Sequence, residues 1–287
     1  MLTIFTPTFN RAELLKRVYD SLLRQREKNF SWLIVDDGST DNTKEVVEEW
    51  LREGRINIQY EYQENGGKMR AHNQGVNLCN TELFLCLDSD DFLTEDAVEI
   101  ILSCYEKKIK GNPKYGGIVA HKGQDVKTPL YGAIFPKVRE STLYGLYERG
   151  FSGETTLIFR TQLLKQHLFP EIPGEKYVPE DYVYDQIDKN YVLYVVPKVL
   201  TLCQIVKDGY TDNVKKLREE NPYGWFLYYR QRASLAKPSL LKLKYISHYL
   251  RFASTVGENV WRKTELSKGW LLLGIPGALL LFAAKKK

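Results

Sequence analysis

Short apolar runs alternate with segments of helical periodicity over the first hundred residues. The run Leu2–Phe5 predicts a strand that ends at Thr6-Pro7, where proline interrupts the pattern. Residues 14–22 then place their apolar side chains on one face of a helix. Asn10 is expected to open this helix, with Glu13 three residues later as its partner in a capping box.

The same alternation continues further along the chain. Phe30–Val35 is a second apolar run, and residues 46–51 supply the inner face of a second helix. Residues 56–62 alternate apolar and polar positions, which predicts a half-exposed strand. Leu83–Leu87 is apolar throughout, as expected of a strand that is covered on both faces.

Strands that alternate with helices predict an α/β fold with a mostly parallel central sheet and helices on both of its faces. Ligands bind to such sheets beyond the carboxyl ends of the strands. Three of the predicted strands end in polar or acidic clusters, which are Thr6–Arg11, Asp36-Asp37 and Asp88–Asp91. Their convergence on one edge of the sheet is the main functional signal in the sequence.

The rest of the chain changes character twice. Residues 112–212 are less regular and rich in Gly, Pro and Tyr, with a short strand expected at Leu157–Phe159. From Tyr223 the pattern becomes helical and basic, and it ends in the 15-residue apolar stretch Trp270–Ala284, which three lysines follow. We therefore divide the chain into residues 1–110, 111–212 and 213–287.

The composition limits the class of protein. The 287 residues are 43% hydrophobic and 13% aromatic, which is too apolar for a disordered chain and enough for one large core or two modest ones. The four cysteines form no CxxC pair, which argues against a structural zinc site or a disulfide scaffold and favours a reducing cytosol. The N-terminus lacks a basic segment followed by a long apolar run, so no signal peptide is expected.

Charge is divided unevenly along the chain. Residues 213–287 carry 15 Lys and Arg against 4 Asp and Glu, whereas residues 1–212 carry 26 against 32. The two parts are therefore expected to face different partners. The acidic balance of the longer part argues against a nucleic-acid partner for the whole chain.

Asp88, Asp90 and Asp91 directly follow the most apolar strand. Three carboxylates in one place repel one another unless a cation joins them. Oxygen ligands suit Mg²⁺ or Mn²⁺, and Mg²⁺ binds through one or two carboxylates plus substrate phosphates. The alternative is a turn before the helix that residues 94–96 open. The buried strand and the two neighbouring clusters favour the metal interpretation.

The acidic pair Asp36-Asp37 ends a strand in the same way. A carboxylate there can accept a hydrogen bond from N3 of uracil, whereas cytosine has only an acceptor at that position. This contact would therefore select the base. The alternative is a turn at Gly38, with Ser39 or Asp41 capping the next helix.

The segment Asn65–Asn73 joins a glycine turn to the start of a helix. Backbone amides at a helix start attract anions, and Lys68 and Arg70 add positive charge for a diphosphate. The segment is neither a Walker motif nor GxGxxG, so dinucleotide binding and P-loop chemistry lose support. The alternative is a Gly-Gly turn that leads into a solvated basic helix.

Taken together, these motifs resemble those of inverting glycosyltransferases of family two, which have the GT-A nucleotide-sugar fold. The resemblance is carried by Thr6–Arg11, Val35–Asp41, Asn65–Lys68, Ala71–Asn73, Asp88–Asp91 and Glu180-Asp181. Each motif alone is weak, but six of them in the family's order are specific. The likeness is strong over residues 1–100, moderate to about residue 212, and fades after that.

The resemblance implies roles for the matching residues. Donor binding would fall to Thr6, Pro7, Phe9, Asp37, Lys68, Arg70, Asn73 and Asp88, with the first three lining the uridine pocket and Asp37 holding the uracil edge. Asp90 and Asp91 would bind Mn²⁺ or Mg²⁺, and Asp181 would be the catalytic base. Many members have Arg where this chain has His72, so Lys68 or Arg70 would supply that charge instead.

The resemblance also assigns functions to the predicted segments. Residues 1–110 would be the nucleotide-sugar-binding half of a GT-A domain, and residues 111–212 its acceptor-binding half. Inversion in one displacement needs a base that takes the proton of the attacking hydroxyl, and a carboxylate such as Asp181 can do so. A divalent cation stabilises the charge of the leaving nucleoside diphosphate. The alternative for Glu180-Asp181 is a polar loop before a helix over Tyr182–Asp188.

The C-terminal extension differs from that of processive synthases of this family. The chain has neither their QxxRW motif nor several long transmembrane helices, so it is expected to add one sugar or a few. Its last apolar stretch is shorter than the roughly 20 residues that cross a bilayer. Residues 213–287 are therefore expected to form a helical, basic, amphipathic extension on an anionic membrane surface. The alternative is a buried helix or one that joins copies into a homo-oligomer.

We therefore expect a metal-dependent glycosyltransferase that uses a UDP-sugar. The acceptor would be a hydroxyl of a glycan or of a polyprenyl-linked glycan, and the sugar would be transferred to it with inversion. The reaction would take place at the cytoplasmic face of a bacterial membrane during surface-polysaccharide or cell-wall synthesis. One alternative is a haloacid-dehalogenase-type phosphatase, although its nucleophilic Asp normally ends the first strand. The other is a non-catalytic glycan-binding scaffold, against which intact Asp88, Asp90 and Asp181 argue.

Overall fold

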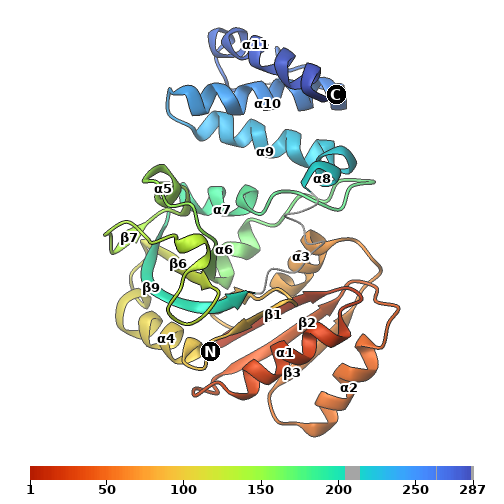
Figure 1. Ribbon diagram of the computed structural model, residues 1–287, viewed down its shortest axis with the longest axis vertical. Helices are drawn as coiled ribbons and strands as arrows, with labels where there is room; N and C mark the ends of the chain where they lie inside the picture. Colours follow the sequence, from red (N-terminus) through yellow and green to blue (C-terminus); the bar gives the residue numbers. More distant parts are fainter. Residues whose placement is uncertain (204–213, 263, 286–287) are drawn as a thin grey trace. The chain divides into compact units, whose positions relative to one another are not determined.

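The computed structural model describes residues 1–203, 214–262 and 264–285 (Figure 1). These residues form two compact units. The first contains residues 1–168 and the chain from Val183 to the end of the last strand. The second contains Phe169–Tyr182 and the helices that follow that strand. The boundary predicted near residue 212 lies outside the described residues.

The strands of the first unit form a single sheet. They are β1 (Leu2–Thr8), β2 (Phe30–Asp36), β3 (Ile58–Tyr62), β4 (Leu83–Cys86), β5 (Asp91–Leu93), β6 (Tyr115–Gly123), β7 (Glu140–Ser141), β8 (Thr155–Arg160) and β9 (Val192–Cys203). Their order in the described part of the chain is β3-β2-β1-β4-β8-β6-β9-β5, and β7 pairs with β9. The segments predicted as residues 1–110 and 111–212 therefore share one sheet.

The sheet is mixed. β1 pairs in parallel with β2 and β4, and β2 with β3, as the alternation of strands and helices predicts. β8 runs antiparallel to both β4 and β6, whereas β6 and β9 are parallel. The second half of the sheet thus adds antiparallel pairs to a parallel N-terminal half.

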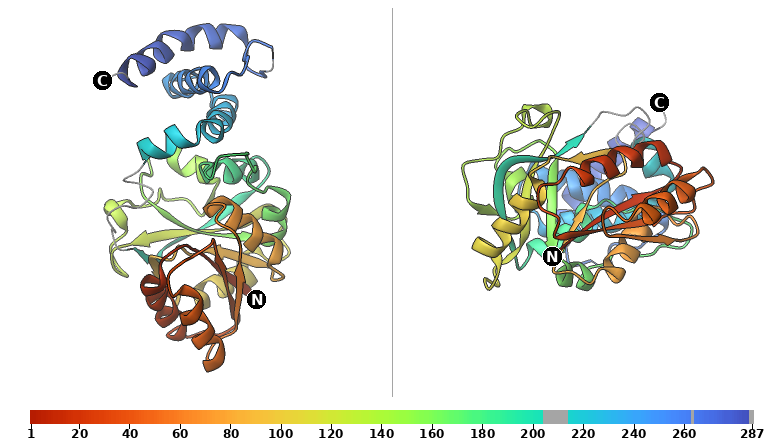
Figure 2. Two further views of the ribbon diagram at one scale, coloured as in Figure 1. Left: turned by 90° about the vertical axis from the view of Figure 1, so that its right-hand side faces the viewer. Right: turned by 90° about the horizontal axis from the view of Figure 1, so that it is seen from below.

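Helices cover both faces of this sheet. Those of the first 168 residues are α1 (Ala12–Leu23), α2 (Thr43–Glu53), α3 (Lys68–Leu78), α4 (Ala97–Cys104), α5 (Leu143–Glu148) and α6 (Thr161–Gln166), with the short η1 (Tyr105–Ile109) and η2 (Leu130–Gly132). On one face, Trp32 of β2 stacks with Tyr19 of α1, which in turn stacks on Trp50 of α2. On the other face, Phe5 and Phe84 pack edge-on against His72 of α3. The predicted coverage of both faces is confirmed (Figure 2).

The first strand is longer than predicted. β1 continues through Pro7 to Thr8, and Pro7 stands opposite Val35 in the register with β2. Proline normally interrupts a central strand because it has no N–H to donate. Here β4 ends at Cys86, which is paired with Phe5, so the position beside Pro7 on that side has no β4 neighbour. The proline therefore costs no hydrogen bond between β1 and β4.

The second unit is helical. Its elements are α8 (Val214–Glu220), α9 (Pro222–Leu235), α10 (Leu240–Val256), α11 (Lys268–Lys285) and the segment that leads into α7 (Asp181–Asp188). The carboxylate of Glu175 accepts hydrogen bonds from the amides of Tyr223 and Gly224, which satisfies the N-terminus of α9. A cluster of aromatic side chains, including Trp225 and Phe252, fills the core between α9 and α10.

The last helix packs closely on α10. A Cβ added at Gly274 would lie 2.4 Å from Ile246, and one at Gly277 would lie 2.3 Å from the Ser247 hydroxyl, so both positions need glycine for this approach. The Ser247 hydroxyl also donates to the carbonyl of Gly274 at 3.1 Å. In the described residues, every helix is too short or too polar to span a membrane. Lys286 and Lys287 of the predicted basic terminus lie outside those residues.

A buried histidine makes the second unit sensitive to acid. His248 of α10 is 7% exposed and stacks on Tyr229, and burial together with the charges of Arg218 and Arg251 lowers its pKa from 6.5 to about 4. In the unfolded chain His248 is protonated below about pH 6.5, whereas in the folded chain it stays neutral down to about pH 4. We expect full stability above pH 6.5 and a loss of about 3 kcal/mol of unfolding free energy as the pH falls to about 4.

Thermal melting followed by circular dichroism at several pH values tests this expectation. His248→Phe keeps the stacked ring but cannot be protonated, so its melting temperature should fall less between pH 6.5 and 4 than that of the parent. His167→Phe is the matched control, since this ring is only partly buried and should leave the acid dependence as it is. Equal acid dependence in parent and H248F would contradict the assignment.

Candidate functional site

The carboxyl ends of three parallel strands meet at one edge of the sheet. Thr8, at the end of β1, stands opposite Asp36 at the end of β2, and the amide of Asp37 donates to the Thr8 carbonyl at 2.8 Å. On the other side of β1, the amide of Leu87 donates to the Phe5 carbonyl at 2.8 Å. The residues that follow β2 and β4 therefore emerge at the same edge, on either side of β1. Their convergence on one edge was predicted from the sequence, whereas the strand order was not.

The turn after β1 is fixed by the turn after β2. Asn10 has a positive φ of 53°, and its side-chain oxygen accepts hydrogen bonds from the amides of Thr40 and Asp41. The prediction that Asn10 and Glu13 cap the first helix is wrong, because the helix begins at Ala12. The Ala12 amide donates instead to the carboxylate of Asp41, 29 positions along the chain. Tertiary partners replace the local cap.

The predicted uridine-binding residues occupy different environments. Thr6 is fully buried, and its hydroxyl accepts a hydrogen bond from the Trp32 indole at 3.0 Å. Pro7 is buried within the strand, whereas the ring of Phe9 is 45% exposed just beyond it. The hydroxyl of Thr8 is buried at this edge and has no hydrogen-bond partner among the described residues. A polar group of a ligand would satisfy that hydroxyl.

Asp37 is held tightly by the glycine turn. Its carboxylate accepts hydrogen bonds from the side chains of Gln63 and Asn65 and from the amides of Gly66 and Gly67, at 2.7 to 3.1 Å. Gly67 adopts a φ of 91°, which glycine tolerates. The predicted nucleobase contact of Asp37 stays a prediction, and four donors already use the usual acceptor capacity of the carboxylate.

The same turn delivers Lys68 to the acidic cluster. Its ammonium lies 2.7 Å from Asp88, and the lysine side chain is only 15% exposed. Arg70, two residues further into α3, is partly buried, and Asn73 is buried at 5% exposure. His72, at the position where the resemblance implies arginine in many members, is 5% exposed and packs edge-on against Phe5 and Phe84. Its ring is part of the core.

Three cations surround the carboxylates that follow β4. Lys68 pairs with Asp88, Arg11 lies 3.2 Å from Asp90, and Lys122 lies 2.8 Å from Asp91 and 3.8 Å from Asp88. Arg11 also donates to the Ser89 hydroxyl at 3.2 Å. The repulsion expected among the carboxylates is therefore relieved by the chain's own basic groups.

The electrostatic balance differs between the carboxylates. Burial works to raise the pKa of Asp88, but Lys68 and Lys122 outweigh it and hold that pKa well below the usual range. Burial and the charge of Asp88 raise the pKa of Asp91 even though Lys122 opposes them. The Asp91 side chain is 8% exposed, compared with 30% for Asp88 and 23% for Asp90. Asp90 and Asp88 are thus the carboxylates that a ligand can reach.

The donor set fits a cation that a substrate helps to hold. Within residues 1–203, 214–262 and 264–285, no three His, Cys, Asp or Glu side chains are grouped as a ready-made metal site. Mg²⁺ commonly binds through one or two carboxylates and completes its shell with phosphate oxygens and water. Asp90 offers such a carboxylate, since it is partly exposed and its 3.2 Å distance to Arg11 is longer than the 2.7 and 2.8 Å of the Lys68–Asp88 and Lys122–Asp91 pairs.

The predicted base belongs to the second unit. Asp181 is the first residue of α7, and one of its carboxylate oxygens lies 2.7 Å from the guanidinium of Arg232 in α9. Its side chain is 38% exposed, whereas that of Arg232 is 5% exposed. Burial raises the pKa of Asp181, Arg232 lowers it, and Glu180 raises it, with an upward net shift. The carboxylate is thus both accessible and more basic than usual.

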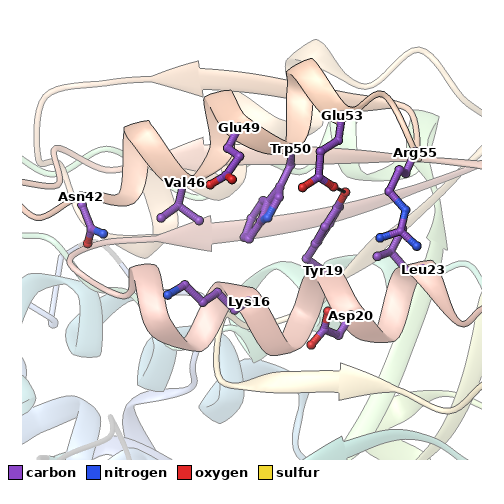
Figure 3. Close-up of a pocket in the computed structure, with 10 residues that line it drawn as sticks. All are labelled: Lys16, Tyr19, Asp20, Leu23, Asn42, Val46, Glu49, Trp50, Glu53 and Arg55. Atoms are coloured by element: carbon purple, nitrogen blue, oxygen red, sulfur yellow. Dashed lines mark hydrogen bonds between the residues drawn. The ribbon is translucent and has the colours of Figure 1, made fainter.

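A pocket lies away from these residues, between α1 and α2. It measures about 520 Å³, and Figure 3 shows the rings of Tyr19 and Trp50 in it, with the Tyr19 hydroxyl donating to Glu53 at 2.7 Å. None of the predicted site residues lines this pocket. It is therefore distinct from the strand edge that gathers the acidic clusters.

Two of the basic residues that pair with the acidic cluster, Lys122 and Arg11, have no role predicted from the sequence. Lys122 comes from β6, where no motif surrounds it, and its only sequence signal is a lysine after His121 near the end of a mainly apolar strand. Arg11 falls inside the predicted cluster Thr6–Arg11, but no sequence motif assigns it a function. The register that brings β6 beside β8 and β9 is what places Lys122 near Asp91.

Comparison with protein families gives a match over more than half of the chain. Residues 3–164 match the model described as "Glycosyl transferase family 2". The match covers the three strand ends, the glycine turn and the acidic cluster, and it ends before Asp181. It sets aside the phosphatase alternative.

Several relatives are similar over different lengths. A GalNAc(5)-diNAcBac-PP-undecaprenol beta-1,3-glucosyltransferase of Campylobacter jejuni is 26% identical over 248 residues, which are 83% of this chain and 75% of the relative. An uncharacterized glycosyltransferase of Rickettsia felis is 29% identical over 59% of this chain. A poly-beta-1,6-N-acetyl-D-glucosamine synthase of Staphylococcus aureus is 26% identical over 52% of it. The chain spans only 27% of the Rickettsia protein and 34% of the Staphylococcus protein.

Solved structures share the fold. Staphylococcus aureus TarS 1-349 in complex with UDP-GlcNAc has a TM-score of 0.63 at 17% identity, covering 96% of this chain and 79% of its own. The mannosyltransferase PcManGT of Pyrobaculum calidifontis, in complex with GDP-Man and Mn²⁺, has a TM-score of 0.58 at 17% identity, covering 99% of this chain and 79% of its own.

Proposed function

The chain belongs to glycosyltransferase family 2, and from this membership we propose that it transfers a sugar from a UDP-sugar to a hydroxyl of a glycan or lipid-linked glycan, with inversion. The observation that carries the proposal is the edge where β1, β2 and β4 end. There Asp88 pairs with Lys68 and Asp90 pairs with Arg11, while Asp37 holds the glycine turn that leads into Lys68. Such an arrangement suits a nucleoside diphosphate, because carboxylates accept hydrogen bonds from its N–H and hydroxyl groups and basic side chains bind its phosphates.

The donor nucleotide is proposed to bind beyond the end of β1. The exposed ring of Phe9 would stack on the base, beside Thr6 and Pro7 of the strand. The buried Thr8 hydroxyl, which lacks a partner among the described residues, would meet a polar group of the nucleoside. Asp37 would hold the uracil edge if one of its four present donors gives way.

The diphosphate is proposed to bind beside the glycine turn. Asp88 is proposed to bind the ribose of the donor. Lys68 starts α3, and its ammonium already contacts Asp88, so it can bridge this carboxylate and a phosphate. Arg70 and Asn73 would complete this side. Asp90 would hold Mn²⁺ or Mg²⁺ together with the diphosphate, with Asp91 behind it as the less accessible carboxylate. The bound cation would stabilise the negative charge of the leaving group.

Asp181 is proposed as the base that removes the proton of the acceptor hydroxyl. Its accessible carboxylate and raised pKa support this role, because a stronger base accepts a proton more readily. The acceptor is proposed to be a glycan carried on a polyprenyl lipid, in line with the undecaprenol in the name of the Campylobacter relative. One sugar or a few would be added, at the cytoplasmic face of a bacterial membrane.

A donor-hydrolysis screen tests the proposal. The full chain is incubated with UDP-, GDP- and dTDP-sugars in Mn²⁺, Mg²⁺ or EDTA, and release of the nucleoside diphosphate is measured. We expect release from a UDP-sugar with Mn²⁺ or Mg²⁺ and background release in EDTA. Asp90→Asn should lower the metal-dependent rate by about tenfold or more. Asp125→Asn, a carboxylate in an exposed loop, is the matched control.

The outcomes of the screen are distinct. Release from a GDP-sugar instead, as the GDP-Man complex of the Pyrobaculum structure would suggest, corrects the nucleotide but keeps the reaction class. Release at an equal rate in EDTA would contradict the metal. No release from any donor, in a folded protein supplied with acceptor, would revive the scaffold alternative.

A further inference from the structure

An exposed stripe of leucine residues runs along α11. Leu272, Leu273, Leu279 and Leu280 are 58% to 72% exposed, and Pro276 between them is also exposed. Positions spaced by one, four, seven and eight residues lie on one face of a helix. This set, called the α11 stripe below, is therefore one continuous apolar surface. Figure 2 shows α11 beside α10 at the end of the chain.

The opposite face of the same helix is already occupied. Leu271 is fully buried and Ala278 is 6% exposed, and the glycines between them seat α11 on α10. Apolar residues therefore occupy both the buried and the exposed face of α11. The basic residues of the extension lie at the ends of this helix and in the segments before it. Single exposed leucines are ordinary, but a contiguous row of them marks an interaction surface.

Basic residues frame the stripe. Residues 213–287 carry 15 Lys and Arg against 4 Asp and Glu. Lys268 begins α11, Lys285 ends it, and no charged residue lies between them. Arg262 is exposed beside Trp261, whose ring is 45% exposed. An exposed apolar face that follows a basic segment with an exposed tryptophan suits a lipid interface, where apolar side chains enter the acyl boundary and basic groups meet anionic headgroups.

We propose that the α11 stripe docks on an anionic lipid bilayer, with α11 lying in the plane of the interface while its other face stays on α10. Charge decides between the candidate occupants. A second copy of the chain would bring the same positive excess to the contact, which opposes association. An anionic leaflet supplies the opposite charge, at about 1 kcal/mol per basic residue near the surface. The inference does not rest on the donor chemistry, although it suits a lipid-linked acceptor.

The test is co-sedimentation of the full chain with vesicles. One set contains phosphatidylglycerol mixed with phosphatidylcholine, and the other contains phosphatidylcholine alone. We expect binding to the anionic vesicles that weakens as salt is raised, and weak binding to the neutral ones. The double variant Leu272→Glu/Leu279→Glu should bind the anionic vesicles at least about tenfold more weakly, because two apolar side chains leave the interface and two like charges enter it.

A matched control separates the stripe from a general charge effect. Leu51→Glu/Leu168→Glu makes the same change at leucines that are 42% and 36% exposed in the first unit, and it should alter vesicle binding by less than about twofold. Circular dichroism checks the fold of each variant. If the first pair does not fold, Leu273→Ser/Leu280→Ser removes the other half of the stripe without adding charge.

Three results would overturn the proposal. One is failure of the parent to bind anionic vesicles, and another is equal binding by the parent and a folded stripe variant. The third is a dimer, measured by light scattering, that the stripe variant dissociates while vesicle binding stays unchanged, since this would make a second copy the occupant. Donor hydrolysis by the stripe variant should equal that of the parent, so the test fails separately from the proposed function.

Discussion

The substitution Asp181→Asn is expected to lower sugar transfer by about 10²–10⁴-fold, the range typical for loss of a general base. Asparagine keeps the shape of the side chain but cannot accept a proton from the attacking hydroxyl. The proposed donor-binding residues all belong to the first unit, whereas Asp181 belongs to the second. Affinity for UDP, measured by calorimetry, should therefore change by less than about threefold. Transfer is followed with a glycan acceptor and the donor identified by the hydrolysis screen.

The pH dependence of transfer gives a second readout of the same residue. Burial and Glu180 raise the pKa of Asp181 by more than Arg232 lowers it. A base is inactive when protonated, so transfer should decline on the acid side at a higher pH than an ordinary aspartate, whose pKa is near 3.8, would give. Glu180→Gln removes the neighbouring charge, so it should shift this decline to lower pH while keeping most of the maximal rate.

Glu180, beside Asp181, is the carboxylate that could replace it as the base, so comparing variants of the two residues can contradict the assignment. If D181N transfers sugar at the parent's rate and E180Q does not, the base is Glu180. If both variants transfer normally, the proton goes to a group outside this pair. A D181N protein that loses UDP affinity and transfer together would indicate a structural role, exerted through the contact with Arg232.

The α/β fold was predictable because its N-terminal half is encoded locally. Each of β1, β2 and β4 is a short apolar run that stops at residues with turn chemistry, such as Asp37-Gly38 after β2. Such runs fix both the strand and the edge where its last residues emerge. The sheet, the GT-A resemblance and the C-terminal helices are confirmed by the structure and by the family match.

The antiparallel half was not predictable from the same signals. β8 inserts between β4 and β6, and these partners are joined by no hairpin turn. Strand pairing of this kind depends on tertiary packing, and the apolar pattern of β6 is equally compatible with either direction. The cap of the first helix failed for the same reason, since Asp41 lies far from Ala12 in sequence.

The candidate site shows the same division. Clusters at Asp36-Asp37 and Asp88–Asp91 stand out because each directly follows an apolar strand and parallel strands bring their carboxyl ends to the same edge. Lys122 does not stand out, since its partner Asp91 lies 31 residues earlier and only the sheet brings them together. A cation that neutralises a predicted acidic site is therefore hard to find from the sequence, although the unrelieved charge of that site implies that one exists.

The substitution Lys122→Met is expected to lower the free energy of unfolding by about 3 kcal/mol, because it removes one partner of a buried ion pair. The Lys122 ammonium lies 2.8 Å from Asp91, and these side chains are 17% and 8% exposed. Methionine fills a similar volume but leaves the Asp91 carboxylate buried without its cation. Chemical denaturation measures the loss, and Asp91→Asn in the same chain should recover most of it.

The companion variant Lys114→Met removes a lysine of the same β6 region from an exposed pair. Lys114 lies 2.7 Å from Glu140, with side chains 49% and 40% exposed, so its loss should cost less than about 1 kcal/mol. Equal stability of K122M and K114M would contradict the buried pair.

The donor KM separates a stabilising role from a positioning role. Lys122 also lies 3.8 Å from Asp88, the proposed ribose-binding carboxylate. If the lysine orients Asp88, the KM for the UDP-sugar should rise in K122M at temperatures where the variant is fully folded, and K122R should restore it in part. A KM unchanged in folded K122M would confine Lys122 to stabilising the turn after β4, because Lys68 alone would then suffice to hold Asp88.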